Sequence, residues 1–175
     1  MKGLRVGLGI MVVFTLIVGP VSAAPATKGD AVGGVGYRLV DGERRVAYSI
    51  SARGGANGPT GSFLYRSVTF SLTFGGPVTC LDIDGNEAAI GGRITHVQSF
   101  GHENDFLLGL NYLVFVQDNG SGSLGSVGPD VVSQTYILPG DPVDVPADFP
   151  ATCPDAASTD HDAYDVEGDF VVADR

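Results

Sequence analysis

The chain has 175 residues with 26 glycines and 10 prolines, and 20 acidic against 10 basic side chains give it a formal net charge of −10. No Lys or Arg occurs between Arg93 and Arg175. Nucleic-acid phosphates need clustered cations, so the composition argues against a nucleic-acid partner. Glycine and proline recur without a fixed period, which argues against collagen and solenoid folds and favours short strands with frequent turns.

The first 23 residues have the pattern of a cleavable secretory signal. Lys2 and Arg5 give a positive start, an apolar run of 13 residues follows at 6–18, and Val21-Ser22-Ala23 supplies small residues at the cleavage point. The run is too short to span a bilayer, which takes about 20 residues. We therefore expect residues 1–23 to be removed and residues 24–175 to form one extracellular domain without membrane insertion.

Alternation of apolar and polar residues predicts a series of short strands after the signal. They are expected at residues 44–53, 63–74, 78–83, 87–97, 106–117, 131–138 and 168–172. The second range holds one strand or two, because Phe63–Arg66 either precedes or joins the alternating run at 68–74. Residues 54–59 are a loop by composition, and Gly75-Gly76-Pro77 is expected to turn the chain.

Two of these segments carry more specific signals. Asp84-Gly85 lies between two β-rich runs, and this dipeptide favours a tight hairpin because the turn needs a positive φ. Residues 106–117 are apolar on both parities, which predicts a strand covered on both faces. The length of that segment also allows a helix, against which stand Gly109, Asn111 and the β-branched and aromatic residues around them.

The expected fold is all-β. About eight strands lie at hairpin distance from one another, and no segment reads as a convincing helix. Short connections favour antiparallel neighbours, so we expect a single antiparallel meander. Closing it fully or partly into a barrel would remove the exposed edges, and a two-sheet sandwich is the alternative.

Cys80 and Cys153 are the two cysteines of the chain. In an exported protein an even count suggests a disulfide, whereas a metal site would need a C-x-x-C spacing that is absent here. Bridging them would close a loop that the chain-entropy model values at about 4 kcal/mol. We expect the bridge to pin the irregular, acidic segment 139–167 to the body of the domain.

Three motifs resemble those of an uncharacterised family of small secreted bacterial all-β proteins. The first is the hairpin at 78–92, with the sequence VTCLDIDGNEAAIGG; the second is VQDNG at 116–120, and the third is GDFVV at 168–172. The resemblance covers residues 34–172 and includes a cysteine ahead of the last strand. Members usually carry an acidic residue after the second motif, where this chain has Ser121. The resemblance implies a secreted β fold and lends no activity or catalytic residue.

Several acidic or histidine-containing clusters could in principle bind a metal, but simpler interpretations are favoured. The Asp82–Asn86 segment lacks the EF-hand spacing and reads as a hairpin turn. His102 with Glu103 and Asp105 reads as a polar turn between strands. His161 lies in an acidic run that also has the composition of a solvated tail. We expect neither a bound metal nor a cofactor.

The leading hypothesis is a secreted, non-catalytic β module that binds an extracellular ligand or protein whose identity the sequence does not name. The alternatives are a barrel that carries a small apolar ligand, a protease inhibitor that uses a loop at 54–59 or 121–128, and an exported enzyme that uses His96 or His102. No nucleophile-elbow, Walker, zinc or dinucleotide motif occurs. For the carrier, a cavity of several hundred Å³ with a mouth near His96 is expected. Its candidate lining residues, which parity places inward, are Tyr48, Phe70, His96, Tyr112 and Tyr136.

Overall fold

The computed structural model describes residues 29–40, 42–120, 129–139, 146–156 and 163–175. The predicted signal peptide at 1–23, the loop at 121–128 and His161 lie outside the described residues. Within them the chain forms ten strands: β1 Ala31–Val40, β2 Glu43–Arg53, β3 Thr60–Ser67, β4 Leu72–Asp84, β5 Glu87–Arg93, β6 His96–Ser99, β7 Asn111–Gln117, β8 Val131–Ser133, β9 Tyr136–Leu138 and β10 Ala163–Ala173.

Two short 3-10 helices, η1 Phe100–His102 and η2 Asp105–Leu107, lie between β6 and β7, and the described residues contain no α-helix. Nothing helical in this part of the chain has the length and apolarity needed to cross a membrane. The predicted strand at 106–117 is therefore shorter than expected, because η2 and Gly109, with a φ of 89°, precede β7.

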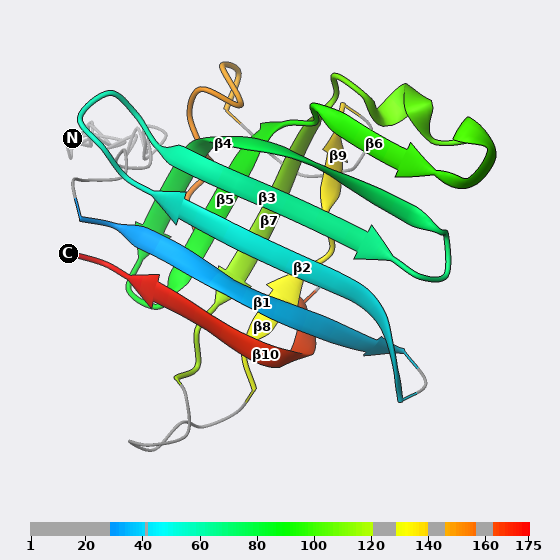
Figure 1. Cartoon of the computed structure of the whole chain (residues 1–175). Coiled ribbons are helices and arrows are strands. Elements are labelled where there is room, and N and C mark those ends of the chain that lie inside the picture. The colour runs from blue at the N-terminus through cyan, green and yellow to red at the C-terminus, as the bar shows by residue number, and fades with distance from the viewer. Residues whose placement is uncertain (1–28, 41, 121–128, 140–145, 157–162) are drawn as a thin grey trace, which may run out of the picture.

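Eight strands close into an antiparallel barrel (Figure 1). The order is β3-β2-β1-β10-β8-β7-β5-β4, and β4 pairs back with β3. β6 adds to the first part of β4, and β9 adds to β7. In Figure 1, β1, β2, β3 and β10 cross in front of β4, β5 and β7. The predicted antiparallel meander closed into a barrel is confirmed, with the last strand pairing with the first.

β1 is the strand that the sequence did not predict. Its glycines interrupt the alternation of apolar and polar residues that would mark a strand. The structure shows why one of these glycines is required. A Cβ on Gly36 would lie 2.5 Å from the ring of Phe170, a fully buried residue of the neighbouring strand β10. Only glycine leaves room for that aromatic ring, so the segment loses its apolar signature where it packs most closely.

The turn predicted at Gly75-Gly76-Pro77 is wrong, because these residues continue β4. β4 instead changes partner there, from β6 to β5. A Cβ on Gly76 would lie 2.0 Å from the carbonyl oxygen of Arg93, so the backbones approach too closely for any side chain. The chain turns earlier, at 68–71, where Ser71 has a φ of 46°. This turn contains no Gly, Asn or Pro, and the alternation of apolar and polar residues continues through it, so the sequence pattern predicted a strand there.

Closure between β8 and β10 depends on two carboxylates, Asp118 and Asp130, which we call the carboxylate seam. β8 pairs with β10 over only three residues, Ala163 to Asp165. Beyond them the N–H groups of β10 find side-chain acceptors: Phe170 N–H donates to Asp130 Oδ2 at 2.7 Å, and Val172 N–H donates to Asp118 Oδ2 at 3.0 Å. The second and third motifs of the family resemblance therefore meet at this seam.

The other oxygens of the seam carboxylates hold the loop that follows β7. Asn119 N–H donates to Asp130 Oδ1 at 3.0 Å, and Gly120 N–H donates to Asp118 Oδ1 at 2.7 Å. Each carboxylate thus ties the end of β7 to β10 in place of a paired strand. The DNG residues of the second motif therefore take part in closing the barrel.

We expect Asp130→Ala to lower the free energy of unfolding by about 3 kcal/mol, because it removes two charged hydrogen bonds and leaves a buried N–H unpaired. Urea denaturation measures the change. Asp169→Ala is the matched control, because Asp169 lies exposed on the same strand, and a change within about 0.5 kcal/mol is expected there. Equal effects of the two substitutions would contradict the role of the seam.

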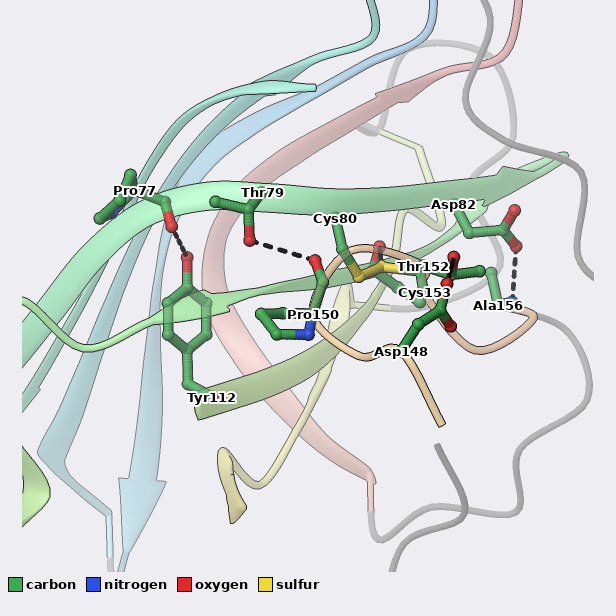
Figure 2. The surroundings of a disulfide bond; sticks show 11 residues. Pro77, Thr79, Cys80, Asp82, Tyr112, Asp148, Pro150, Thr152, Cys153 and Ala156 are labelled. Carbon is green, nitrogen blue, oxygen red and sulfur yellow. Dashed lines mark hydrogen bonds between the residues drawn. A yellow bond between two sulfur atoms is a disulfide. The ribbon is translucent and has the colours of Figure 1, made fainter. Parts of the chain in front are cut away.

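A segment at 146–156, which we call the clamp, covers the outer face of the barrel (Figure 2). The predicted disulfide is confirmed: Cys80 of β4 is bonded to Cys153 of the clamp, and both are buried. Thr79 Oγ1 donates to Pro150 O at 3.2 Å, and Ala156 N–H donates to Asp82 Oδ2 at 2.9 Å. The irregular segment was expected to continue to residue 167, but β10 already begins at Ala163.

The clamp completes a second hydrophobic cluster outside the barrel. Its buried members are Cys80, Ala89, Leu113, Phe115, Tyr136, Leu138, Cys153 and Ala156. This explains why β5 and β7 are apolar on both parities, since one face packs into the barrel and the other packs under the clamp. Burial raises the pKa of the Asp82 carboxyl at the edge of this cluster, and the hydrogen bond from Ala156 opposes that effect.

Reduction of the disulfide is expected to lower the free energy of unfolding by about 4 kcal/mol, because the bridge closes a loop between residues 73 apart. Thermal unfolding with and without a reductant measures this. The double variant Cys80→Ala/Cys153→Ala should start from the lower stability and show no further response to the reductant. A reductant that leaves the melting temperature of the native chain unchanged would contradict the clamp.

Candidate ligand-binding site

Aromatic side chains fill the middle of the barrel. Phe63 and Tyr112 stack with ring centroids 4.6 Å apart, and their exposed fractions are 1% and 0%. The Tyr112 hydroxyl donates to the Pro77 carbonyl oxygen at 3.0 Å, at the point where β4 changes partner (Figure 2). This satisfied hydroxyl closes the centre of the barrel, so the interior is not hollow throughout.

One end of the barrel is hollow. There a cavity of about 700 Å³ opens to solvent, and we call it the cup. It lies at the end where β3 turns into β4, on the right in Figure 1. Its lining comes from five strands, the turn at 68–71, the loop at 100–107 and the break between β8 and β9: Arg38, Tyr48, Tyr65, Thr69, Phe70, Ser71, Leu72, Phe74, Phe100, Glu103, Asn104, Leu107, Gln134, Thr135 and Ile137.

Three aromatic rings at the inner end of the cup form what we call its floor. Tyr65 and Phe74 stack with centroids 4.7 Å apart, and Tyr48 meets Tyr65 edge-on at 5.6 Å. Phe74 continues to Phe63 at 6.3 Å, so the floor is the last layer of the aromatic core. Tyr48 and Phe74 are buried and support Tyr65, which is only partly buried, so its ring gives a rigid apolar surface on which a planar group can pack.

Arg38 supplies a positive charge to this aromatic cup. It shares the inward parity of Val32 on β1 and lies opposite Val166 of β10. Its guanidinium carbon lies 3.3 Å from the ring centroid of Tyr164, and its side chain is hydrogen-bonded to Tyr48. Burial raises the pKa of the Tyr48 hydroxyl, which therefore stays protonated at neutral pH. Among the described residues, no carboxylate forms an ion pair with Arg38.

Thr135 contributes a hydroxyl that lacks a partner. Its Oγ1 is buried, and no described residue hydrogen-bonds to it. Gln134 and Thr135, at the break between β8 and β9, both belong to the lining of the cup. A buried unpaired hydroxyl costs about 1–3 kcal/mol.

The rim of the cup carries exposed aromatic side chains. Phe70 on the turn at 68–71 has an exposed fraction of 68%, and Phe100 at the start of η1 has 81%. Glu103 and Asn104 supply polar groups on the same side as Phe100. The mouth is thus amphipathic, with large apolar groups that nothing in the described chain covers.

The residues predicted to line a cavity lie in different parts of the structure. Tyr48 is buried in the floor as expected, whereas Tyr112 lies beneath the floor and does not line the cup. Phe70 does not point inward but lies exposed on the rim, because the chain turns there. Tyr136 packs in the outer cluster against Phe115, on the opposite face of the sheet. His96 is exposed and outside the lining, so the mouth expected near it is elsewhere.

The residues that the sequence did not indicate are mainly Arg38 and Thr135. An inward arginine is visible only when the parity of its strand is known, and β1 was not predicted. Thr135 was placed in one continuous strand at 131–138, which the structure divides into β8 and β9. Asp84 of the calcium candidate is exposed at the hairpin turn, and no group of three or more metal-ligating side chains gathers within the described residues.

A scan against protein-family models, a search of curated proteins and a search of solved structures find no match to this chain. The resemblance to small secreted bacterial β proteins therefore stays a prediction that rests on its three motifs.

We expect Thr135→Val to raise the free energy of unfolding by about 1 kcal/mol, because it removes an unpaired buried hydroxyl and keeps the side-chain shape. Denaturation of the two proteins without ligand measures the change. Thr79→Val is the matched control: its hydroxyl donates to Pro150, so the same replacement should lower stability. Destabilisation by Thr135→Val of the same size as in the control would show that this hydroxyl is paired.

Proposed function

We propose that this chain is an exported, non-catalytic binding protein that holds a small amphipathic molecule in the cup. The observation that carries the proposal is the cup itself, about 700 Å³ in volume with an aromatic floor. Small-molecule sites typically measure about 300–1,000 Å³ and combine an apolar lining with a few polar groups. Arg38, Asn104 and Gln134 are among the polar groups of the lining here. The earlier alternative of an apolar-ligand barrel is thus favoured over a module that binds only through its surface.

The cup can provide useful affinity from its apolar surface alone. If a ligand buried about 100 Å² of apolar area in the cup, transfer from water would contribute about 2.5 kcal/mol. A small, rigid ligand is favoured, since the core beneath the floor is filled and allows no deeper entry.

The lining supports binding more than catalysis. Its described residues include no histidine or cysteine, which are the usual general bases and nucleophiles. His96, one candidate of the enzyme hypothesis, is exposed away from the cup. Ser71 lies in the lining, and among the described residues no hydrogen bond joins its hydroxyl to a basic side chain.

Export is part of the same proposal. The disulfide between Cys80 and Cys153 is suited to an oxidising compartment, where such bonds persist. The signal pattern at residues 1–23 supports the same location. A carrier outside the cell gains from a covalent clamp, because it must keep its cup intact without cytosolic chaperones. The protease-inhibitor alternative depends on loops at 54–59 and 121–128, of which the second lies outside the described residues.

The test is a titration of the purified chain with phenylnaphthylamine, a neutral dye that fluoresces in apolar sites. The chain contains no tryptophan, so protein emission interferes little. We expect saturable binding to one site. Phe70→Ala and Phe100→Ala should each weaken it at least threefold, because they remove apolar contact at the rim, about 0.7 kcal/mol or more.

Phe106→Ala is the matched control. Phe106 has the same exposed fraction as Phe70, 68%, and lies on the loop that follows β6 without lining the cup. All three aromatic side chains are exposed, so none of the variants should unfold the chain. The dye affinity of the Phe106→Ala variant should equal that of the native chain. Absence of saturable dye binding, or equal losses in all three variants, would overturn the proposed function.

A further inference from the structure

We infer that the ligand of the cup is a planar aromatic or similarly flat molecule that carries a carboxylate or an equivalent anionic group. This inference rests on the proposed function and names the chemical class of the molecule. In this arrangement the flat body lies on the floor formed by Tyr65 and Phe74, and the anionic group binds Arg38. Two observations carry it: the fixed position of Arg38 and the absence of a described countercharge.

Arg38 is held in place before any ligand arrives. The ring of Tyr164 supports one face of the guanidinium at 3.3 Å, and Tyr48 accepts a hydrogen bond from it. A guanidinium has five N–H donors in a planar fork, and one hydrogen bond leaves several of them unused. A fork oriented in advance binds a carboxylate with two parallel hydrogen bonds at little further loss of side-chain entropy.

The charge balance around the cup favours an anion at this point. The whole chain carries a net charge of −10, yet no described carboxylate pairs with this inward arginine. Its neighbours in the lining of the cup are largely aromatic or neutral. The exposed carboxylates Asp165 and Glu167 of β10 share a separate hollow with Arg38, outside the lining of the cup. A ligand anion would provide the missing countercharge in a medium where electrostatic attraction is stronger than in water.

Glu103 is the one carboxylate among the residues that line the cup. It is exposed on the rim, in the loop between η1 and η2. Water screens it there, so it weakens the attraction for an anion without cancelling it. The aromatic lining could also suit a cation such as a quaternary ammonium. Arg38 at the inner wall opposes that ligand, and a matched set of probes separates the two.

The experiment measures displacement of phenylnaphthylamine by three compounds with the same ring system: naphthylacetate, naphthylacetamide and naphthylmethyl-trimethylammonium. They present an anionic, a neutral and a cationic group to the cup. We expect naphthylacetate to bind at least tenfold more tightly than naphthylacetamide, because a charge-assisted hydrogen bond replaces a neutral one. The cation should bind most weakly.

Three variants locate the effect. Arg38→Gln should bring the ratio of acetate to acetamide affinity close to one. Arg53→Gln removes the same charge at the far end of the barrel, where Arg53 lies exposed opposite Ala31 at the start of β1, and should leave the ratio unchanged. Glu103→Gln should raise acetate affinity about twofold, because it removes a screened repulsion. Since Glu103 is exposed, this variant tests the inference even if Arg38→Gln does not fold.

The outcomes separate the inference from the proposed function. Equal affinities for acetate and acetamide, with the dye still bound in the cup, would overturn the anionic class and leave the proposed function standing. Tighter binding of the cation would also overturn it. An acetate preference that survives Arg38→Gln and does not respond to Glu103→Gln would contradict the assignment to Arg38. Failure of the dye itself to bind would overturn the proposed function.

Discussion

The barrel depends on side-chain carboxylates that accept hydrogen bonds from β10 where the neighbouring strand β8 is too short to provide backbone acceptors. β8 pairs with β10 over three residues, and Asp118 and Asp130 then take the N–H groups of Val172 and Phe170. At the other end of β8 the chain bends at Gln134 and Thr135 before β9 begins, and these two residues form part of the wall of the cup. Extending β8 before Val131 would pair more of β10 with backbone and make the two carboxylates unnecessary.

The sequence predicted the features that depend on local patterns. Period-two alternation gave most of the strands, Asp84-Gly85 gave the hairpin between β4 and β5, and an even cysteine count gave the disulfide. It did not predict features that depend on contacts between distant segments. β1 is rich in glycine because Phe170 packs against it, and the turn at 68–71 is hidden because apolar alternation runs through it.

The candidate site was only partly predictable for the same reason. Tyr48 was placed correctly because its strand alternates clearly. Alternation shows which residues share a face of a strand, but not whether that face points into the barrel or towards the clamp. Tyr136 therefore appeared equivalent to Tyr48, although it packs in the outer cluster. Arg38 could not be identified as a lining residue until β1 was known to pair with β10. The chemistry that decides the ligand class lies in these unpredicted residues.

The cup combines a filled, rigid core below with an open, amphipathic mouth above, so a ligand binds at the surface of a preformed aromatic floor and needs no opening of the barrel. The most direct measurement is a crystal structure of the chain with naphthylacetate. The account predicts the ring stacked on Tyr65 and Phe74 with its carboxylate on the Arg38 guanidinium. A structure in which Phe70 and Phe100 fold in to fill the cup, with the ligand bound elsewhere, would contradict it.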